Sequence, residues 1–147
     1  MTVRYMEIDD LDQVMPIEND CFSVPWTREG FFTFLTRKDS MFLVAEEKGE
    51  ILGYCGILMV LDEADVTNVA VRKDRRKEGI GGFLMKSLIL LAEEQGIVTF
   101  HLEVRESNLS ARSLYERLGF YTDGLRKGYY TDPDEDAVLM SRQKETE

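Results

Sequence analysis

Apolar and polar positions recur with two different periods along the chain, and together they predict a mixed α/β fold. Short alternating or continuous apolar runs predict strands at residues 3–5, 41–46, 51–61, 66–71, 97–105, 120–123 and 137–140. Apolar residues at helical spacing predict helices at residues 11–18, 28–35, 79–95 and 108–118. Because a helix crosses over between the two central strands, we expect a mixed sheet of about six to seven strands with helices on both faces.

Residues that break helices and strands refine this outline. Asp9 or Asp10 is expected to cap the first helix, and Pro16 predicts either a kink in it or a late start. Residues 126–136 predict a polar loop, and the tail SRQKETE at 141–147 is expected to be frayed. Since no linker or repeat divides the chain, we expect one domain over residues 1–147.

The stretch VTNVAVRKDRRKEGIGGFLM, at residues 66–85, joins a predicted strand to the long helix through a basic, glycine-rich turn. The N–H groups that open a helix have no partner within it and lie at its positive end. Glycine also lets a ligand approach the backbone closely. The pattern R-x-x-G-x-G at residues 76–81 therefore favours phosphate binding, although a tight strand-to-helix turn needs glycine as well. The stretch lacks the dinucleotide fingerprint and the Gly-Lys-Ser/Thr of a P-loop.

Glu103 and Tyr115 are candidates for acid–base chemistry. Glu103 lies near the end of a central, otherwise apolar strand, where a carboxylate costs free energy unless it is used or satisfied. The structural alternative for it is a salt bridge to Arg105 or Arg112. Tyr115 falls on one face of the helix that Asn108 begins or caps, and its structural alternative is packing with the hydroxyl in water.

Charge and composition narrow the class of protein. The formal net charge is −10, from 18 basic and 28 acidic residues, which argues against sequence-independent nucleic-acid binding. A basic protein partner is compatible with this charge, although ordinary solubility is the more common reason for it. No apolar stretch approaches the roughly 20 residues of a membrane span, and MTVRYMEIDD lacks the features of a secretory signal. We therefore expect a cytoplasmic protein without a membrane segment, in which Cys21 and Cys55 are free thiols.

The motifs and their order resemble the Gcn5-related N-acetyltransferase (GNAT) superfamily. The matching pieces are VAV followed by R-x-x-G-x-G and the run NLSARSLYERLGF at residues 108–120. Within the superfamily, the chain is most similar to the RimI branch, the ribosomal-protein alanine N-acetyltransferases. This similarity is carried by the Pro25-Trp26 turn, LDEADVTNVAV at 61–71, LEVRESN at 102–108 and the Gly128-Tyr129-Tyr130 loop, and it extends from Asp9 to Met140.

This resemblance implies a GNAT fold in which acetyl-CoA lies in a splay between the fourth and fifth strands. It implies that Glu103 accepts a proton and that Tyr115 donates one. The implied cofactor-binding residues are Val69, Ala70, Val71, Arg76, Lys77, Glu78, Gly79, Ile80, Gly81, Gly82 and Asn108. Glu78 departs from relatives, which often carry glycine or a basic residue there, so its side chain must turn away from the phosphates.

The acceptor implied by the resemblance is the N-terminal alanine of small-subunit ribosomal protein eighteen. Aromatic Trp26, Tyr129 and Tyr130 are expected to hold the chain end. Acidic Asp62, Glu63 and Asp65 are expected to attract a basic segment, although surface solvation alone explains these acids as well. An α-amine has a pKa of about 7.7–8.0 and needs a base before it can attack. A direct transfer of this kind needs no covalent acyl-enzyme.

Other functions remain open at this point. The same fold can acetylate a small amine, or it can serve as a non-catalytic acetyl-CoA-binding subunit. A cysteine nucleophile is disfavoured because Cys55 lies in an apolar run and His101 has no evident link to either thiol. No metal is expected, since His101 lacks partners at ligand spacing. The sequence leaves the oligomeric state open.

Overall fold

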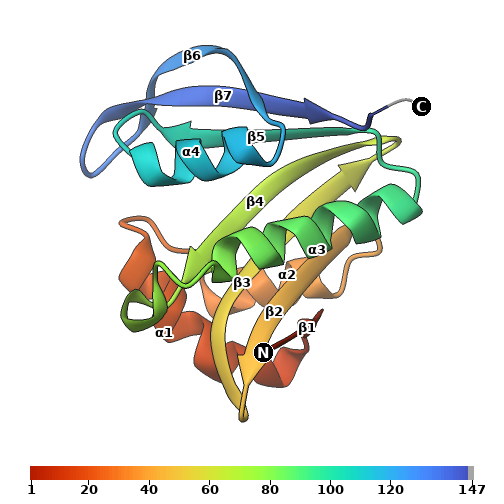
Figure 1. The fold of residues 1–147 in the computed structure, drawn as a ribbon. Helices are drawn as coiled ribbons and strands as arrows, with labels where there is room; N and C mark the ends of the chain where they lie inside the picture. Colours follow the sequence, from red (N-terminus) through yellow and green to blue (C-terminus); the bar gives the residue numbers. More distant parts are fainter. Residues whose placement is uncertain (146–147) are drawn as a thin grey trace.

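The computed structural model describes residues 1–145 as a single seven-stranded sheet flanked by helices on both faces (Figure 1). The strands are β1 (Thr2–Tyr5), β2 (Ser40–Glu47), β3 (Glu50–Val60), β4 (Glu63–Val71), β5 (Thr99–Arg105), β6 (Tyr121–Tyr130) and β7 (Glu135–Gln143). The helices are α1 (Leu11–Cys21), α2 (Arg28–Leu35), α3 (Ile80–Glu94) and α4 (Leu109–Arg117), with short 3-10 turns at η1 (Ile8–Asp10) and η2 (Lys73–Arg75). The strand order is β1-β2-β3-β4-β5-β7-β6, and only β4 and β5 pair in parallel. The predicted mixed α/β class is confirmed.

Most helix ends follow the local signals of the sequence. The Thr27 hydroxyl caps α2 by accepting a hydrogen bond from the Gly30 N–H at 3.0 Å, and Gly96 follows α3 with a φ of 97°. Of the two alternatives that Pro16 predicts for the first helix, the late start is wrong, because α1 begins at Leu11 and continues through Pro16. Asp10 occupies its N-cap position, but the carboxylate binds the Glu7 N–H and Arg4 instead of the amides of α1.

Two predictions for the C-terminal part of the chain are wrong. Residues 126–136 are not a loop, because β6 continues to Tyr130 and β7 already begins at Glu135. β6 is an edge strand whose side chains are mostly exposed, so its residues carry no apolar alternation. The tail is paired further than expected, since β7 reaches Gln143 and the Lys144 N–H bonds to the Val98 carbonyl at 2.7 Å. The end of that tail, residues 146–147, lies outside the described residues.

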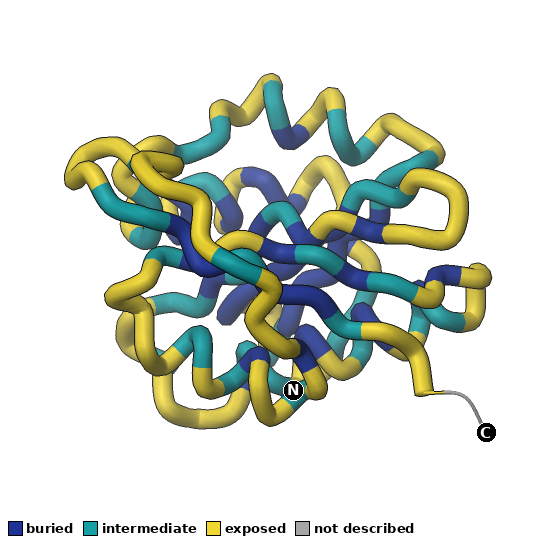
Figure 2. The backbone as a smooth tube through the Cα atoms, turned by 90° about the horizontal axis from the view of Figure 1, so that it is seen from above, coloured by how far each residue is buried: buried dark blue, intermediate teal, exposed yellow. Residues whose placement is uncertain are grey.

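The sheet separates two hydrophobic clusters. α3 and α4 cover one face, and the cluster beneath them contains Leu84, Leu88, Phe100 and Tyr115. α1 and α2 cover the other face over an aromatic cluster that includes Phe31. In Figure 2 the buried segments run through the middle of the molecule, between exposed loops. Over residues 1–145, no helix combines the length and apolar character needed to cross a membrane.

β4 and β5 pair only at their beginnings. Their parallel register covers three residue pairs, from Glu63 with Thr99 to Asp65 with His101. Beyond these pairs the two strands diverge. In Figure 1 they lie close together at the right of the sheet and far apart at the left. We call this opening the splay. It lies at the centre of the sheet, with α3 and α4 on one face and α1 on the other.

Gly56 on β3 lies beside the bulge of β4 and allows the Phe42 ring of β2 to pack closely against it. The β3–β4 register shifts between Gly56 and Ile57, so that Thr67 is the extra residue on β4. A Cβ atom on Gly56 would lie 2.1 Å from the Phe42 ring. This position therefore has room only for hydrogen.

Gly56→Ala is expected to lower the free energy of unfolding by about 1–3 kcal/mol, because the methyl group overpacks against Phe42. The matched control is Gly124→Ala on β6, where nothing lies within 4 Å of the added Cβ atom. Urea unfolding of both variants measures the difference. Equal midpoints for the two variants would contradict the proposed steric constraint.

Candidate active site

The edge of β4 that faces the splay presents backbone groups of alternate residues. The Arg72 N–H bonds to the Leu52 carbonyl at 2.8 Å, which makes these two residues a hydrogen-bonded pair of the β3–β4 ladder. Such pairs alternate along an antiparallel ladder, so Ala70 also bonds to β3, through Tyr54. The backbone groups of Val69 and Val71 consequently point away from β3, toward the splay. Of the predicted Val69–Val71 group, only Val69 and Val71 can offer backbone hydrogen bonds to a ligand there.

The glycine-rich turn opens α3 with unpaired amides. Lys77 and Gly79 have φ values of 66° and 81°, and Gly79 is the N-cap of α3. The first hydrogen bond of the helix runs from the Phe83 N–H to the Gly79 carbonyl at 3.0 Å. The N–H groups of the three residues between them, 80–82, therefore have no intrahelical partner. This concave turn at the positive end of a helix is suited to an anion.

The basic side chains of this turn are mostly engaged with neighbouring acids. Arg75 binds Glu78 at 2.9 Å and also approaches Glu47, while Arg72 binds Asp74 at 2.6 Å. Glu78, the departure from the family pattern, is thus held by Arg75.

Arg76 folds back instead of projecting from the turn. Its guanidinium donates to the Val71 carbonyl at 3.3 Å and to the Cys21 sulfur at 3.3 Å. Lys77 is exposed beside the unpaired amides. The positive potential of the turn therefore comes mainly from Lys77, Arg76 and the helix end, because Arg72 and Arg75 are paired with acids.

Glu103 lies on β5 just beyond the last residue paired with β4. Phe100, Leu102 and Val104 are buried against α3 and α4, so Glu103 projects from the opposite face of the sheet. Partial removal from water raises the pKa of its carboxyl, and the negative charge of Asp65 on β4 raises the pKa further.

The predicted alternative for Glu103, an ion pair with Arg105 or Arg112, is wrong. Arg105 pairs with Glu135 at 3.3 Å, and Arg112 donates to the Glu106 carbonyl at 2.8 Å. Their guanidinium groups are therefore occupied elsewhere. Arg126 on β6 is the cation whose charge favours the ionised carboxylate of Glu103.

Tyr115 and Asn108 approach the site from α4. Tyr115 is only 8% exposed, and burial raises the pKa of its phenol well above the ordinary value, with smaller contributions from Tyr130 and Cys55. The phenol therefore remains protonated at neutral pH. The predicted alternative of a hydroxyl in open water does not fit this burial. Asn108 caps α4 as predicted, since its Oδ1 accepts from the Ala111 N–H at 3.2 Å.

The β6–β7 hairpin brings Tyr129 and Tyr130 next to Glu103. The charge of Glu103 contributes to a raised pKa of both phenols, which burial raises first and most, to about 12 for Tyr130. Arg105 holds the hairpin in place. Its guanidinium donates to the carbonyls of Thr131 and Pro133, and its Cζ atom lies 4.5 Å from the centre of the Tyr130 ring. The structure therefore places both tyrosines at the site through backbone contacts that the sequence does not reveal.

The same guanidinium of Arg105 reaches across to the Ser23 hydroxyl at 3.3 Å, which ties the α1–α2 turn to the hairpin. Trp26 also lies in this turn, but its ring packs on Phe34 and Phe31, with centroids 4.7 and 5.1 Å away. Trp26 is thus largely a packing residue that anchors the turn.

Glu63 makes a side-chain contact and Asp62 a backbone contact where β4 and β5 are still paired. The Glu63 carboxylate binds the His101 Nε2 at 2.7 Å, and the other ring nitrogen of His101 contacts the Ser141 hydroxyl at 2.9 Å. The Asp62 carbonyl accepts from the Val98 N–H at 2.8 Å. The histidine is therefore directed to Glu63 and Ser141. Cys55 is fully buried, and burial raises the pKa of its thiol, which supports its assignment to the core.

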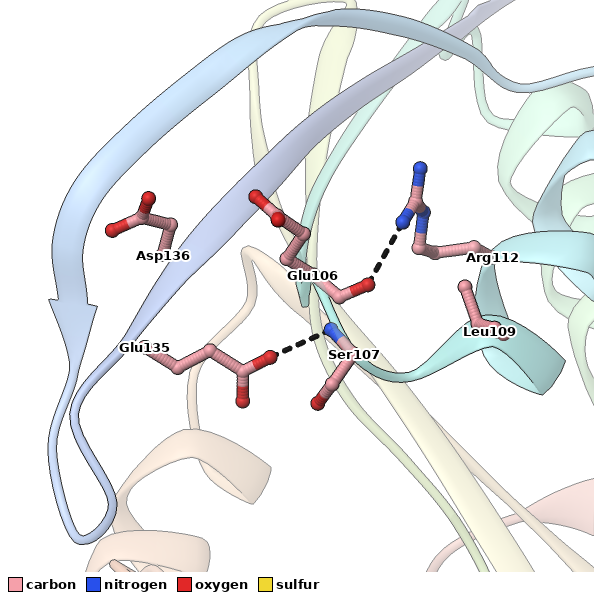
Figure 3. A pocket seen from close by; sticks show the side chains of 6 residues that line it. All are labelled: Glu106, Ser107, Leu109, Arg112, Glu135 and Asp136. Carbon is pink, nitrogen blue, oxygen red and sulfur yellow. Dashed lines mark hydrogen bonds between the residues drawn. The ribbon is translucent and has the colours of Figure 1, made fainter.

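An open pocket lies where α4 and β7 begin, beyond the C-terminal end of β5 (Figure 3). Its lining residues are Glu106, Ser107, Leu109, Arg112, Glu135 and Asp136. Glu135 accepts from the Ser107 N–H at 2.6 Å, as the dashed line in Figure 3 marks. The lining holds three carboxylates and the guanidinium of Arg112, and one of these carboxylates, Glu135, is paired with Arg105.

Arg126 is missing from the predicted site, and the sequence predicts for Asp65 only the attraction of a basic segment, not its action on Glu103. β4 begins at Glu63, three residues earlier than predicted, so Asp65 is a strand residue with its side chain beside Glu103. The buried Ala64 and Val66 alternate with the exposed Glu63 and Asp65. That alternation was a signal for the longer strand. Arg126 carried no such signal, because it lies on the exposed edge strand.

A parallel strand pair that splays beside a glycine-led helix, with a carboxylate at the splay and a tyrosine buried near it, defines an N-acetyltransferase architecture. The sequence profile of the acetyltransferase (GNAT) family matches residues 11–120. The chain belongs to this family of acetyl-CoA-dependent acetyltransferases, and the predicted class of enzyme is confirmed.

Individual relatives resemble the chain over nearly its whole length. A Bacillus subtilis (strain 168) protein, provisionally named a [ribosomal protein bS18]-alanine N-acetyltransferase, is 40% identical over 139 residues, which cover 94% of this chain and 92% of that protein. The Escherichia coli (strain K12) protein of the same name, without the provisional label, is 35% identical over 144 residues and 95% of both chains. The crystal structure of the ribosomal-protein-S18-alanine N-acetyltransferase from Escherichia coli superposes with a TM-score of 0.91 at 33% identity, covering 99% of this chain and 95% of that one. The predicted similarity to the RimI branch is confirmed.

Replacing Asp65 by Asn is expected to lower the pKa of Glu103 toward its ordinary value, because a neighbouring negative charge disfavours ionisation of the carboxyl. Arg126→Gln is the opposing variant and is expected to raise the pKa further, since it removes the cation that favours the carboxylate. NMR titration of protein labelled with ¹³C in its glutamate carboxyl groups measures both shifts, with Glu103→Gln identifying the resonance. Shifts in the same direction in both variants would contradict this electrostatic arrangement.

Proposed function

We propose that this protein transfers an acetyl group from acetyl-CoA to the α-amine of an N-terminal alanine on small-subunit ribosomal protein eighteen. The observation that carries the proposal is the position of Glu103. Its carboxylate lies next to the open edge of β4, has a raised pKa, and faces the two tyrosines of the hairpin. The names of the Escherichia coli and Bacillus subtilis relatives support this acceptor, and a ribosomal acceptor places the reaction in the cytoplasm.

The residues of the splay and of the glycine turn fit the two ends of acetyl-CoA. Val69 and Val71 direct backbone groups into the splay, where they can pair with an amide-containing arm. The unpaired amides of residues 80–82 and the side chain of Lys77 suit a pyrophosphate. When bound, acetyl-CoA supplies a thioester as the acetyl donor.

Glu103 is assigned the role of base. An α-ammonium group cannot attack a carbonyl until it loses a proton, and its pKa of about 7.7–8.0 leaves much of it protonated at neutral pH. The raised pKa of Glu103 brings the carboxylate closer in basicity to that amine, which favours proton transfer. Glu103 takes that proton, and the freed lone pair forms the bond to the acetyl carbon. The nitrogen gives up a second proton as the amide forms, and this proton balances the one that the sulfur receives.

Val69 and Tyr115 are assigned the two remaining roles. The Val69 N–H points into the splay and can stabilise the negative charge that develops on the carbonyl oxygen. As the bond from carbon to sulfur breaks, Tyr115 gives its phenolic proton to the sulfur. Burial keeps the phenol protonated at neutral pH. The same raised pKa makes it a weaker acid, so its proton moves only as negative charge develops on the sulfur. No side chain of the protein is acylated in this sequence of events.

The acidic lining of the pocket beyond β5 supports a peptide acceptor. Its carboxylates at residues 106, 135 and 136 can attract a basic segment that follows the terminal alanine. Arg105 fixes the hairpin and the α1–α2 turn on either side of the approach. A small amine would make no use of these contacts.

The decisive experiment supplies acetyl-CoA with a peptide copying the mature N-terminus of ribosomal protein eighteen, alongside a panel of small amines. Acetylation of the peptide at its α-amine is expected, and Glu103→Gln is expected to reduce kcat/KM by about 10²–10⁴-fold because the base is lost. Glu116→Gln, an exposed carboxylate on α4, is the matched control. Acetylation of small amines alone, or binding of acetyl-CoA without turnover, would contradict the proposal.

Tyr115→Phe is expected to lower kcat about 10²-fold while the Kd of acetyl-CoA stays nearly constant, because the phenolic proton is needed only when the sulfur departs. The comparison variant is Tyr121→Phe, which removes a hydroxyl from a tyrosine that is 48% exposed on β6. Steady-state kinetics and calorimetry separate the two effects. A parallel loss of acetyl-CoA affinity would assign Tyr115 a purely structural role.

A further inference from the structure

Arg105 lies where three elements meet, two residues after Glu103. Both side chains project from the same face of β5, because residues two apart on a strand share a face. The Arg105 guanidinium donates to the carbonyls of Thr131 and Pro133 at 3.0 and 2.9 Å. It also donates to the Ser23 hydroxyl at 3.3 Å. One side chain therefore joins β5 to the tip of the β6–β7 hairpin and to the α1–α2 turn.

Glu135 extends this junction to the residues before α4. Its Oε1 accepts from Arg105 at 3.3 Å, and its Oε2 accepts from the Ser107 N–H at 2.6 Å (Figure 3). The hydrogen bonds from Ser107, and then the one from Arg105, lower the pKa of the Glu135 carboxyl, so it is ionised at neutral pH. Glu135 also lines the pocket beyond β5. The junction therefore adjoins this pocket.

The two segments that Arg105 joins differ in their other support. The α1–α2 turn is held by Glu18, which is 1% exposed and accepts from the Trp26 N–H at 2.9 Å. The same carboxylate accepts hydrogen bonds from side chains on β3 and β4. The hairpin has an irregular register between residues 126 and 130, and residues 131–134 are exposed. Arg105 therefore fastens an exposed hairpin to a well-supported turn.

Tyr130 is the hairpin side chain that Arg105 holds near the base. The Arg105 Cζ atom lies 4.5 Å from the centre of its ring, a distance at which a cation is attracted to an aromatic face. The pKa of the Tyr130 phenol is raised to about 12, first by burial and then by the charges of Tyr129 and Glu103, which Arg105 opposes. The phenol is therefore protonated at neutral pH and is a hydrogen-bonding group next to Glu103.

An acceptor that brings its amine to Glu103 meets Tyr130 there. If the acceptor had to order the hairpin as it bound, part of its binding free energy would be lost. We infer that Arg105 is a positioning residue for the acceptor, because it holds the hairpin and Tyr130 against the α1–α2 turn before the acceptor binds. This inference deepens the proposed function and rests on it for the kind of acceptor. The proposed acetyl-CoA contacts lie on β4 and α3, whereas those of Arg105 lie on the turn, the hairpin and β7.

The test compares wild-type protein with Arg105→Met, which keeps an unbranched side chain and removes the donors. The KM of the best acceptor is expected to rise about 10- to 100-fold, as for the loss of hydrogen bonds to a charged group. The kcat is expected to stay within about threefold, because the bound acceptor orders the hairpin, and the Kd of acetyl-CoA within about twofold. Steady-state kinetics and calorimetry measure these constants. An unchanged KM in folded Arg105→Met would overturn the inference.

Arg142→Met is the matched control. Arg142 on β7 donates to the Leu118 carbonyl at 2.8 Å and pairs with Glu93 at 3.1 Å, on the side of α3 and α4. Its side chain is 19% exposed and that of Arg105 is 25% exposed, so the two substitutions remove comparable contacts. Both variants are expected to unfold at lower urea concentration, but the acceptor KM of Arg142→Met is expected to stay within about twofold. An equal rise of KM in both variants would overturn the inference.

Arg105→Lys is the conservative variant. It keeps one cationic donor and loses the planar fork that reaches Ser23 and the hairpin carbonyls at the same time. Its acceptor KM is expected to rise about threefold or more, and less than in Arg105→Met. If Arg105→Met does not fold, a KM of Arg105→Lys equal to that of the wild type overturns the inference.

The mobility of the hairpin provides a measurement that needs no turnover. Backbone order parameters from ¹⁵N relaxation at residues 128–132 are expected to fall from about 0.85 to below about 0.6 in Arg105→Met and to stay unchanged in Arg142→Met. Turnover of small amines alone refutes the ribosomal acceptor, while the KM for those amines still decides the role of Arg105. If no amine is acetylated, the proposed function fails, and order parameters that stay unchanged in Arg105→Met overturn this inference independently.

Discussion

The site depends on one constraint, the need of buried backbone groups for hydrogen-bond partners. β4 lies in the middle of a seven-stranded sheet, yet β5 leaves it after three residue pairs. From that point the outward backbone groups of Val69 and the Val71 N–H have lost the strand that would normally satisfy them, while the Val71 carbonyl accepts from Arg76. An extended ligand with amide groups can take the place of the missing strand. The family to which the chain belongs uses a co-substrate of that shape.

Around this edge, charge is arranged by local pairing more than by the overall balance of the protein. The net charge is −10, but the turn before α3 neutralises its own basic side chains with Asp74, Glu78 and Glu47. What remains for an anion is the helix end and its amides. At the other end of the splay, Asp65 and Arg126 act on Glu103 in opposite directions. Partial desolvation then decides that the carboxyl is a stronger base than in water.

Two polar side chains connect the elements on either side of the splay and hold them in place. Arg105 links β5 to the β6–β7 hairpin and the α1–α2 turn, and Glu18 links that turn to β3 and β4. Both links are polar and cross long distances in the chain. Acid–base groups that must meet a substrate at hydrogen-bond distance need such support, because small displacements reduce catalysis. The aromatic cluster around Trp26 stabilises the same turn from the apolar side.

The sequence by itself determined the elements and the family, because these depend on local pattern. Periodicity located the strands and helices, Thr27 and Asn108 identified their caps, and the glycine turn with NLSARSLYERLGF identified the acetyltransferase fold. Only the tertiary structure decided which backbone groups face the splay, since this follows from the register of β3 with β4. It also decided that Arg105 serves the hairpin and not Glu103, and that Asp65 lies beside Glu103. Each of these outcomes is set by contacts between residues distant in sequence, and a single chain read in order carries no local signal for them.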